Sequence, residues 1–498
     1  MKIINTLIAP PGAGKTTWLI NHLNQSKDSN SILAFPTKLL AGEVQRRLTS
    51  IGLEFNSINS DTVDGSVVQC LEGNLINQTD RIIICTHESL RLINPDALQG
   101  WHLYIDEIPV TWDCNTCSFT NLSYRKVFDR IVDIVRIGDK DRVKAKDSCK
   151  QLIDDLASGF DSTLSNDACK VLKALLDDRY IVEIDELDAK QKRTMRIIGV
   201  KHYIPAFEAA ETTVIMGAEI QKTLLGVILK GAGWSIIPID ATLDFTGYGN
   251  EVIIHPFFEN KAYSKTAALM KGGKIHHVYQ DDCLLDAWLK VDVFRIIGSR
   301  KAILVAHTWC QPELPVREGS EFSNISRIKI DNRGINDYDD YSIAICLQHG
   351  NITPIENRST LTLAGLLSIK NEIEVAEIKN AIKYERFYES TIQSVCRTAL
   401  RSRSHNGKIL LFVQDIDIAN FLKERIGDCT IDCTYSELVV APTSPAKTNR
   451  EQLKKKAIEL WGKGHNTILI AAQIGKTDRT VRNWLKPYRQ LEELSEDG

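Results

Sequence analysis

The sequence predicts an α/β protein with two parallel-sheet domains, a helical insertion in the first of them, and a small all-α domain near the end of the chain. Three observations support this fold class. Residues 9–17 form a phosphate-binding loop between an apolar run and a helical pattern. Further apolar runs alternate with helical patterns along most of the chain, which is typical of parallel sheets. The 498 residues are too many for one hydrophobic core, so several domains are expected.

The phosphate-binding loop sets the chemistry of the first domain. Its small residues let successive backbone N–H groups curl around an anion, and the positive end of the following helix points at the same place. Lys15 is predicted to reach the β- and γ-phosphates, and the Thr16 hydroxyl to ligate Mg²⁺. The predicted phosphate-binding residues are Pro11, Gly12, Ala13, Gly14, Lys15, Thr16 and Thr17. The loop therefore predicts a nucleoside triphosphate site.

Composition and charge restrict the function classes. The net charge is −3, so a nucleic-acid function needs local basic patches. The 12 cysteines are scattered, which favours a reducing compartment, and no signal segment or membrane-spanning run is evident, so we expect the cytoplasm. A zinc site would require Cys114 and Cys117 to meet Cys429 and Cys433; unrelated reduced thiols are the simpler interpretation.

An acidic pair, Asp106 and Glu107, ends the apolar run of residues 101–105. An Asp-Glu pair alone is usually an exposed turn. Here it follows a phosphate-binding loop and caps a predicted strand. We therefore expect Asp106 to hold Mg²⁺ through water and Glu107 to act as general base toward the attacking water.

Two more strand–turn–helix segments, residues 31–48 and 81–90, complete the pattern. Together with the loop and the acidic pair they resemble the first RecA-like domain of a superfamily 2 helicase. The resemblance implies that one group of residues contacts the nucleic-acid backbone, namely Pro36, Thr37, Lys38, Thr86 and His87. Too few residues precede Lys15 to hold the glutamine motif of the DEAD-box branch, so base specificity stays open.

The first domain is expected to span residues 1–245, with a helical insertion at about 113–201. Amphipathic patterns at 127–135, 149–156 and 168–176 predict three helices, and 180–184 predicts a closing strand. The charged residues of the insertion could form a solvated face, or the insertion could act as a wedge that guides a nucleic-acid strand. The third helicase-like motif is either residues 217–219, by placement, or residues 240–242, by residue type.

The second domain is expected to span residues 250–428. Arg333, Gly334 and Asn336 resemble the fifth helicase motif, which implies a nucleotide contact for Gly334 and Asn336; a plain turn is the alternative. The segment 393–401 resembles the sixth motif. The resemblance implies a catalytic role for Gln393 and implies that Arg397 and Arg401 are arginine fingers, with a basic helix face as the alternative.

A linker is predicted at residues 429–448 and a helix-turn-helix domain at 449–490. This last segment carries ten Lys or Arg against three Asp or Glu, and it resembles the DNA-binding domains of resolvases and transcription regulators. The resemblance implies contacts with duplex DNA from Arg479, Thr480, Arg482 and Asn483. Binding of a partner protein is the alternative.

Together the motifs predict an ATP-dependent DNA helicase or translocase that uses ATP and Mg²⁺. Single-stranded DNA is expected at the motor and duplex DNA at the C-terminal domain, with replication proteins as further partners and no membrane. A replication helicase or origin-binding initiator of a phage, plasmid or mobile element is the expected context. Two alternatives remain. One is a DNA-packaging ATPase, for which Asp337, Asp339 and Asp340 could hold metal; the other is an ATP-gated DNA-binding regulator.

Overall fold

The computed structural model describes residues 2–26, 28–138, 140–158, 164–270, 283–307, 309–310, 324–330, 334, 337–352, 354–367, 372–402, 405, 407–437, 445–463 and 465–485. The chain divides into two compact units, Met1–Glu437 and Leu438–Gly498. Within the described residues, no helix is both long enough and apolar enough to cross a membrane.

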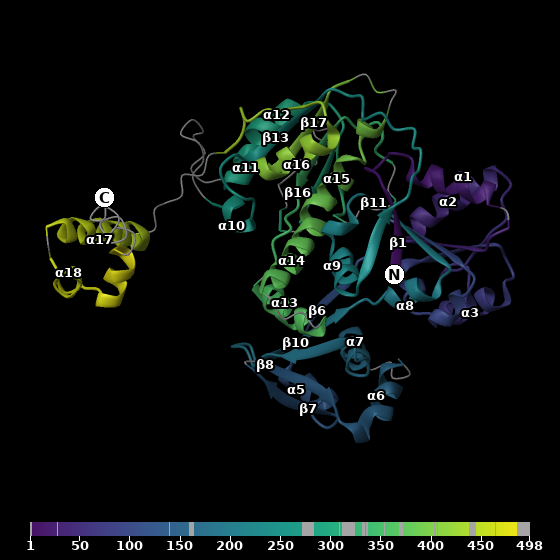
Figure 1. Ribbon diagram of the computed structural model, residues 1–498, viewed down its shortest axis with the longest axis horizontal. Helices are drawn as coiled ribbons and strands as arrows, with labels where there is room; N and C mark the ends of the chain where they lie inside the picture. Colours follow the sequence, from purple (N-terminus) through teal and green to yellow (C-terminus); the bar gives the residue numbers. More distant parts are fainter. Residues whose placement is uncertain are drawn as a thin grey trace, which may run out of the picture. The chain divides into compact units, whose positions relative to one another are not determined.

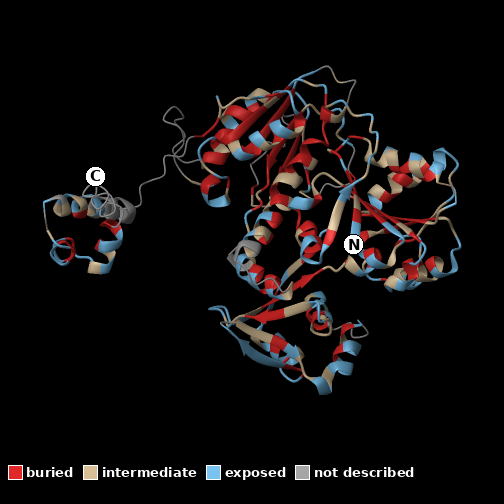
Figure 2. Cartoon of the chain, in the orientation of Figure 1, coloured by how far each residue is buried: buried red, intermediate tan, exposed pale blue. Residues whose placement is uncertain are grey.

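The first sheet of the larger unit has seven strands in the order β12-β1-β11-β5-β2-β4-β3, and every pair is parallel. Its strands are β1 (Lys2–Ile8), β2 (Ser31–Phe35), β3 (Asn56–Ser57), β4 (Ile82–Thr86), β5 (His102–Asp106), β11 (Thr212–Gly217) and β12 (Trp234–Pro238). Successive residues of β2 enter opposite cores, Ile32 on one face and Leu33 on the other. The central strands are therefore buried on both faces, as Figure 2 shows by their red colour.

Helices cover both faces of this sheet. They are α1 (Lys15–Gln25), α2 (Lys38–Ser50), α3 (Val67–Asn77), α4 (His87–Leu90), α8 (Ile204–Ala209) and α9 (Leu224–Gly231), with short turns of 3₁₀ helix at Pro95–Leu98 and Ile220–Lys222. Trp101 is fully buried in one core, and its indole N–H donates to the carbonyl of Leu75 at 3.1 Å.

The insertion after β5 corrects the sequence prediction, because it is built on an antiparallel sheet of order β6-β10-β9-β8-β7. Its elements are β6 (Trp112–Thr120), α5 (Asn121–Val127), β7 (Val132–Ile137), β8 (Lys140–Ala145), a 3₁₀ turn (Asp147–Cys149), α6 (Lys150–Ala157), α7 (Asn166–Leu175), β9 (Tyr180–Ile184) and β10 (Lys192–Val200). The second and third predicted helices and the closing strand are confirmed. The first predicted helix is wrong, since the β-branched run of residues 132–137 pairs with β8 instead.

The second sheet has six strands, all parallel, in the order β15-β14-β16-β17-β13-β18. Its strands are β13 (Val252–Phe258), β14 (Ala302–Ala306), β15 (Ile325–Ile328), β16 (Ile343–Leu347), β17 (Ile409–Asp415) and β18 (Cys429–Ile431). The predicted α/β class with two parallel sheets is thereby confirmed. The predicted linker is wrong at its start, because β18 pairs with β13 and Glu437 still bridges to Phe258.

One long helical segment joins the two parallel sheets. It consists of α14 (Glu372–Lys383), a π-helical segment η5 (Tyr384–Glu389) and α15 (Ser390–Val395), and it is preceded by α13 (Pro354–Leu366). Helix α14 packs against α9 beside the first sheet, and α15 packs against β16 of the second. π-Helical segments concentrate at functional sites, because the extra residue changes which side chains face one direction. The remaining helices are α10 (Lys265–Ala268), α11 (Leu284–Trp288), π-helical η4 (Leu289–Val293), α12 (Phe294–Ile297), 3₁₀-helical η6 (Ala399–Arg401) and α16 (Ile416–Ile426).

The smaller unit contains three helices among its described residues: α17 (Pro445–Gly462), α18 (Thr467–Ile474) and residues 478–485. Gly475 ends α18 in the left-handed conformation at φ 62°, as a helix C-cap requires. The hydroxyl of Thr477 accepts the N–H of Thr480 at 3.3 Å and caps the third helix. The predicted core residues are confirmed as buried: Ala471, Ile474, Val481, Trp484 and Leu485.

Candidate active site

The loop between β1 and α1 holds its lysine against its own backbone. Gly12 and Gly14 have φ of 80° and 87°, which glycine adopts without strain. Lys15 Nζ donates to the carbonyls of Ala9 at 2.8 Å and Pro10 at 3.0 Å. Burial lowers the pKa of Lys15, while the charges of nearby carboxylates, Asp106 first, raise it. The ammonium is therefore held in an acidic environment at the mouth of the loop.

Asp106 lies at the end of β5, next to the start of α1. Its Oδ2 accepts the hydroxyl of Thr16 at 3.4 Å, which joins the two residues predicted to hold Mg²⁺. Asp106 is buried, and burial raises the pKa of its carboxyl, although the charge of Lys15 acts in the opposite direction. A hydroxyl and a carboxylate are oxygen donors of the kind that Mg²⁺ prefers, so the donor set fits this ion.

Glu107 turns away from the strand in a left-handed conformation, with φ of 61°. Its N–H donates to the carbonyl of Met216 at 2.9 Å, and its Oε1 lies 3.9 Å from Nη2 of Arg397. A non-glycine residue at positive φ is uncommon and is enriched at functional sites. Arg397 is buried, and burial lowers the pKa of its guanidinium. The second sheet thus supplies a cation to the predicted general base.

Arg401 reaches the phosphate-binding loop itself. A Cβ added at Gly12 would lie 2.7 Å from Cδ of Arg401, so the arginine stem lies directly on the loop. Tyr248, which sequence reasoning missed, approaches the same loop: its hydroxyl donates to the carbonyl of Pro11 at 2.8 Å and lies 3.3 Å from Sγ of Cys396. In the sequence, the one signal for this contact is that a tyrosine stands in the segment between the two predicted parallel-sheet domains.

A cavity of about 610 Å³ is lined by Lys15 and Glu107 and also by Gln393 of α15. Gly217 and Ala218 also line it, because β11 lies between β1 and β5. Residues 240–242 follow the edge strand β12 instead. Of the two segments considered for the third motif, residues 217–219 therefore contribute two residues to this cavity, and which segment is that motif stays a prediction.

Glu219 then joins the two sheets of the larger unit. Its Oε2 accepts the hydroxyl of Tyr384 at 2.8 Å and lies 2.6 Å from Nη2 of Arg425. Both partners belong to the part of the chain around the second sheet. The pKa of Glu219 is lowered: burial raises it, but hydrogen bonds from Tyr384 and Lys222 and the nearby cationic charges outweigh burial.

The first predicted nucleic-acid segment lies at the start of α2. Thr37 accepts the N–H of Leu40 at 3.2 Å, and the exposed Lys38 pairs with Asp61 at 2.5 Å; Pro36 is half-buried. A Cβ at Gly334 would lie 3.1 Å from both Thr37 Oγ1 and Leu40 N. Gly334 thus borders the start of α2, and its predicted nucleotide contact stays a prediction. Arg333 and Asn336 lie outside the described residues.

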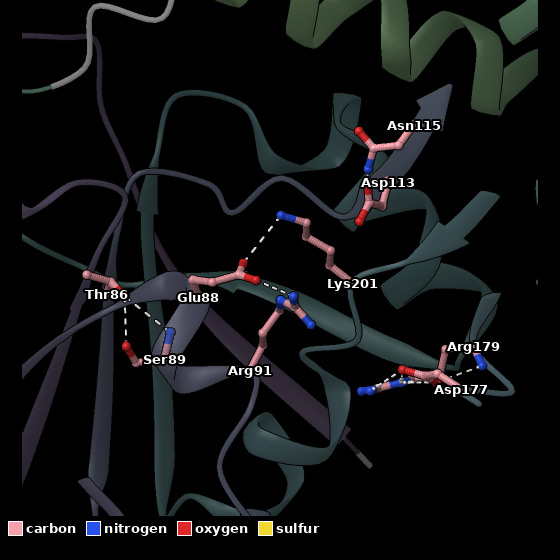
Figure 3. Close-up of polar contacts among 9 residues, drawn as sticks. All are labelled: Thr86, Glu88, Ser89, Arg91, Asp113, Asn115, Asp177, Arg179 and Lys201. Carbon is pink, nitrogen blue, oxygen red and sulfur yellow. Dashed lines mark hydrogen bonds and ion pairs between the residues drawn. The ribbon is translucent and has the colours of Figure 1, made fainter. Parts of the chain in front are cut away.

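The second predicted segment serves mainly to hold α4. Thr86 caps this helix by accepting the N–H of Ser89 at 3.1 Å. His87 is buried, and its Nε2 lies 3.0 Å from the carbonyl oxygen of Asp106. The ring of His87 thus faces the acidic strand, and its predicted contact with nucleic acid stays a prediction. Figure 3 shows Glu88 of α4 between Arg91 and Lys201, so α4 is tied to the chain that leaves the insertion.

The third helix of the smaller unit exposes Arg479, Arg482 and Asn483, whereas Thr480 is half-buried and bonded to Thr477. Arg482 also pairs with Asp478 at 2.6 Å. Within the described part of the chain, no three His, Cys, Asp or Glu side chains gather closely enough to hold a metal ion, and Asp340 pairs with Lys301 at 2.5 Å. The described cysteines include all 12, and each is a free thiol.

No protein-family model matches the chain, and no curated protein is similar to it in sequence. Among solved structures, S. tokodaii Xpd4 is 10% identical, covers 88% of this chain and 96% of its own, and gives a TM-score of 0.47. An XPD helicase is 13% identical, covers 86% of this chain and 96% of its own, and gives a TM-score of 0.48. The DUF1998 helicase MrfA bound to DNA is 12% identical, covers 91% of this chain and 49% of its own, and gives a TM-score of 0.33. At these scores we derive neither ligand nor activity from the likenesses.

Proposed function

We propose that the chain is an ATP-dependent DNA translocase or helicase. One observation carries this proposal: the phosphate-binding loop and acidic pair of the first sheet meet two arginines from the chain between β16 and β17 of the second sheet. Arg397 lies 3.9 Å from Glu107, and the stem of Arg401 lies on Gly12. A site assembled from two sheets responds to their separation, which is how nucleotide hydrolysis becomes motion.

Each residue has a role in ATP hydrolysis under this proposal. Lys15 leaves the loop carbonyls to bind the β- and γ-phosphates, and Thr16 and Asp106 hold Mg²⁺, which neutralises phosphate charge when bound. Glu107 accepts a proton from the attacking water as the bond to the γ-phosphorus forms. The bond from that phosphorus to the bridging oxygen breaks, and ADP and phosphate leave. Arg397 and Arg401 stabilise the negative charge that develops on the transferring group.

Single-stranded DNA is proposed to run along the edge where Thr37 and Lys38 of the first sheet border Gly334, since this edge brings both sheets together. The exposed Arg479 and Arg482 of the smaller unit are proposed to anchor the motor to duplex DNA. A motor joined to a duplex-binding unit fits a replication helicase or origin-binding initiator of a phage, plasmid or mobile element, with replication proteins as partners.

The test is the rate of ATP hydrolysis with and without single-stranded DNA, beside the unwinding of a forked duplex. We expect DNA to stimulate hydrolysis in the wild type and expect Lys15→Ala and Arg401→Ala to lose about a hundredfold or more. Arg295→Ala, which removes an exposed arginine of α12, is the matched control. Hydrolysis that ignores DNA, or that survives Arg401→Ala, contradicts the proposal.

A further inference from the structure

A carboxylate that the proposed mechanism does not use faces the same cavity. Glu389 is the last residue of the π-helical segment η5, and it lines the cavity together with Lys15, Glu107 and Gln393. It lies four residues before Gln393, so the two side chains share one face of the helix. Nothing in the sequence motifs pointed to it.

The only hydrogen bond that the described residues give to this carboxylate comes from Gln393. The amide Nε2 of Gln393 donates to Oε1 of Glu389 at 3.1 Å, whereas Oε2 is enclosed and has no hydrogen-bond partner among the described residues. Burial raises the pKa of Glu389 above its ordinary value, and the Gln393 amide and the charge of Lys15 offset only a part of this rise. Gln393 is thus the donor that satisfies a buried acid.

This contact fixes the direction of the amide. An ionised carboxylate only accepts hydrogen bonds, and a glutamine amide has one donating end and one accepting end. With its NH₂ held by Glu389, Gln393 leaves its carbonyl oxygen for the cavity in which Glu107 lies. We propose that Glu389 is a positioning residue that aims the Gln393 carbonyl at the attacking water. The water then gives one O–H to this carbonyl as a hydrogen bond while its other proton passes to Glu107.

The surrounding contacts hold this segment in place. Tyr384, at the start of η5, donates to Glu219, and Oε1 of Glu385 accepts the N–H of Leu224 at the start of α9 at 2.7 Å. The π-helical segment is therefore anchored to the chain between β11 and β12 of the first sheet. A pair that sits on an anchored helix can hold a water in one orientation, which is worth a large factor in rate.

The inference rests on the proposed ATPase function, and a double-mutant cycle on kcat tests it. The variants are Glu389→Met, Gln393→Ala and the double variant, each assayed for kcat and KM with saturating DNA. We expect Glu389→Met, which has no oxygen to accept the Gln393 amide, to lower kcat about tenfold with KM changed by no more than about twofold. We expect the double variant to be no slower than Gln393→Ala alone, because the first residue acts through the second.

Controls separate the outcomes. Glu424→Gln removes an exposed carboxylate of α16 and is expected to leave kcat unchanged. Glu389→Gln keeps an oxygen that can accept the Gln393 amide and is expected to retain more of kcat than Glu389→Met; Glu389→Leu serves if Glu389→Met does not fold, as judged by thermal unfolding. An unchanged kcat, or a loss that multiplies with that of Gln393→Ala, overturns the inference alone. A wild-type chain that hydrolyses no ATP overturns the proposed function first and this inference with it.

Discussion

Gly12 is the residue at which the two halves of the proposed active site touch. Its φ of 80° is strained for any residue with a Cβ, and the stem of Arg401 occupies the space that a Cβ would need. Gly14 has a similar φ but no atom within 4 Å of an added Cβ. Gly14 is therefore required only by its backbone conformation. Gly12 is required by its backbone conformation and also by the arginine that packs on it.

Gly12→Ala is expected to displace Arg401, because an arginine stem moves more easily than a backbone. We expect kcat for ATP to fall about tenfold or more, as on removal of one stabilising donor. Gly14→Ala carries a comparable backbone strain and is the matched control for stability. ATPase rates of Gly12→Ala, Arg401→Ala and the double variant check the expectation; fully multiplicative losses contradict it.

His349 makes the stability of the larger unit depend on pH. Burial and the charge of His307 lower the pKa of His349 to about 4 from its ordinary 6.5. Between these values the unfolded chain binds more protons than the folded chain, so stability rises with pH and is lost as the pH falls. We expect the free energy of unfolding to fall from about pH 7 to about pH 5, with a shallower slope in His349→Gln.

Urea unfolding at several pH values measures this slope. Burial also lowers the pKa values of His22, His202, His255 and His307, so a part of the slope is expected to remain in the variant. A slope that His349→Gln leaves unchanged contradicts the assignment.

Local chemistry explains which site residues the sequence could predict. The loop of residues 9–17 and the pair Asp106 and Glu107 depend on a few adjacent residues, and the structure brings them together beside one cavity. Tyr248 and Glu389 were missed because their roles arise only when distant segments pack. The contact of the His87 ring with the carbonyl oxygen of Asp106 also depends on such packing, and the sequence motif around His87 does not indicate it.

At the scale of elements, the insertion is fastened to α13 by a buried ionic network. Glu183 of β9 is fully buried, with Nζ of Lys140 at 2.9 Å and Nη2 of Arg196 at 3.4 Å. Lys140 also donates to Thr362 of α13 at 2.7 Å, and Glu183 itself accepts the hydroxyl of Thr362. The acidic side chain therefore stabilises both the antiparallel sheet and its attachment.

Glu183→Gln is expected to lower the free energy of unfolding by about 3 kcal/mol, because it leaves Arg196 buried without one of its two carboxylates. Glu186→Gln, at an exposed position three residues later, is expected to stay within about 0.5 kcal/mol of the wild type. Chemical denaturation of the full chain compares the two. Equal effects at both positions contradict the network's importance.

The same insertion shows why element types were only partly predictable. α6 and α7 carry apolar residues at helical spacing, and the structure has them as helices. Residues 132–137 also fit helical spacing, but Val132, Ile134 and Val135 are β-branched and a partner strand follows at once. Pairing with β8 makes residues 132–137 a strand and not a helix, and the sequence of one segment alone does not reveal such a pairing.

At the scale of the whole molecule, the chain separates a proposed motor from a proposed DNA anchor. The smaller unit, Leu438–Gly498, has its own core of residues from three helices. The sequence predicted this division from composition, although it placed β18 in the linker, because three strand residues give too short a pattern to recognise.

Arg479→Ala combined with Arg482→Ala is expected to weaken duplex binding and to reduce the slope of log affinity against log salt by about two, since each phosphate contact contributes about 0.9. ATP hydrolysis with single-stranded DNA is expected to stay at the wild-type rate. Lys463→Ala, in the same unit and paired with Glu459, is the control. Salt titrations of duplex binding decide the matter; an unchanged slope places the duplex elsewhere.

The helical segment from α14 to α15 has a mechanical consequence. Near its middle, the guanidinium of Arg386 lies 4.9 Å from the ring centre of Trp112, the first residue of the insertion, and just beyond its end Arg397 meets Glu107. A continuous rod between these points transmits load. Any pull on the insertion that shifts the rod also shifts the arginines, and linkage makes the effect reciprocal. Under the proposed function, a load on the insertion would therefore change the geometry of the ATP site and with it the lifetime of the bound nucleotide.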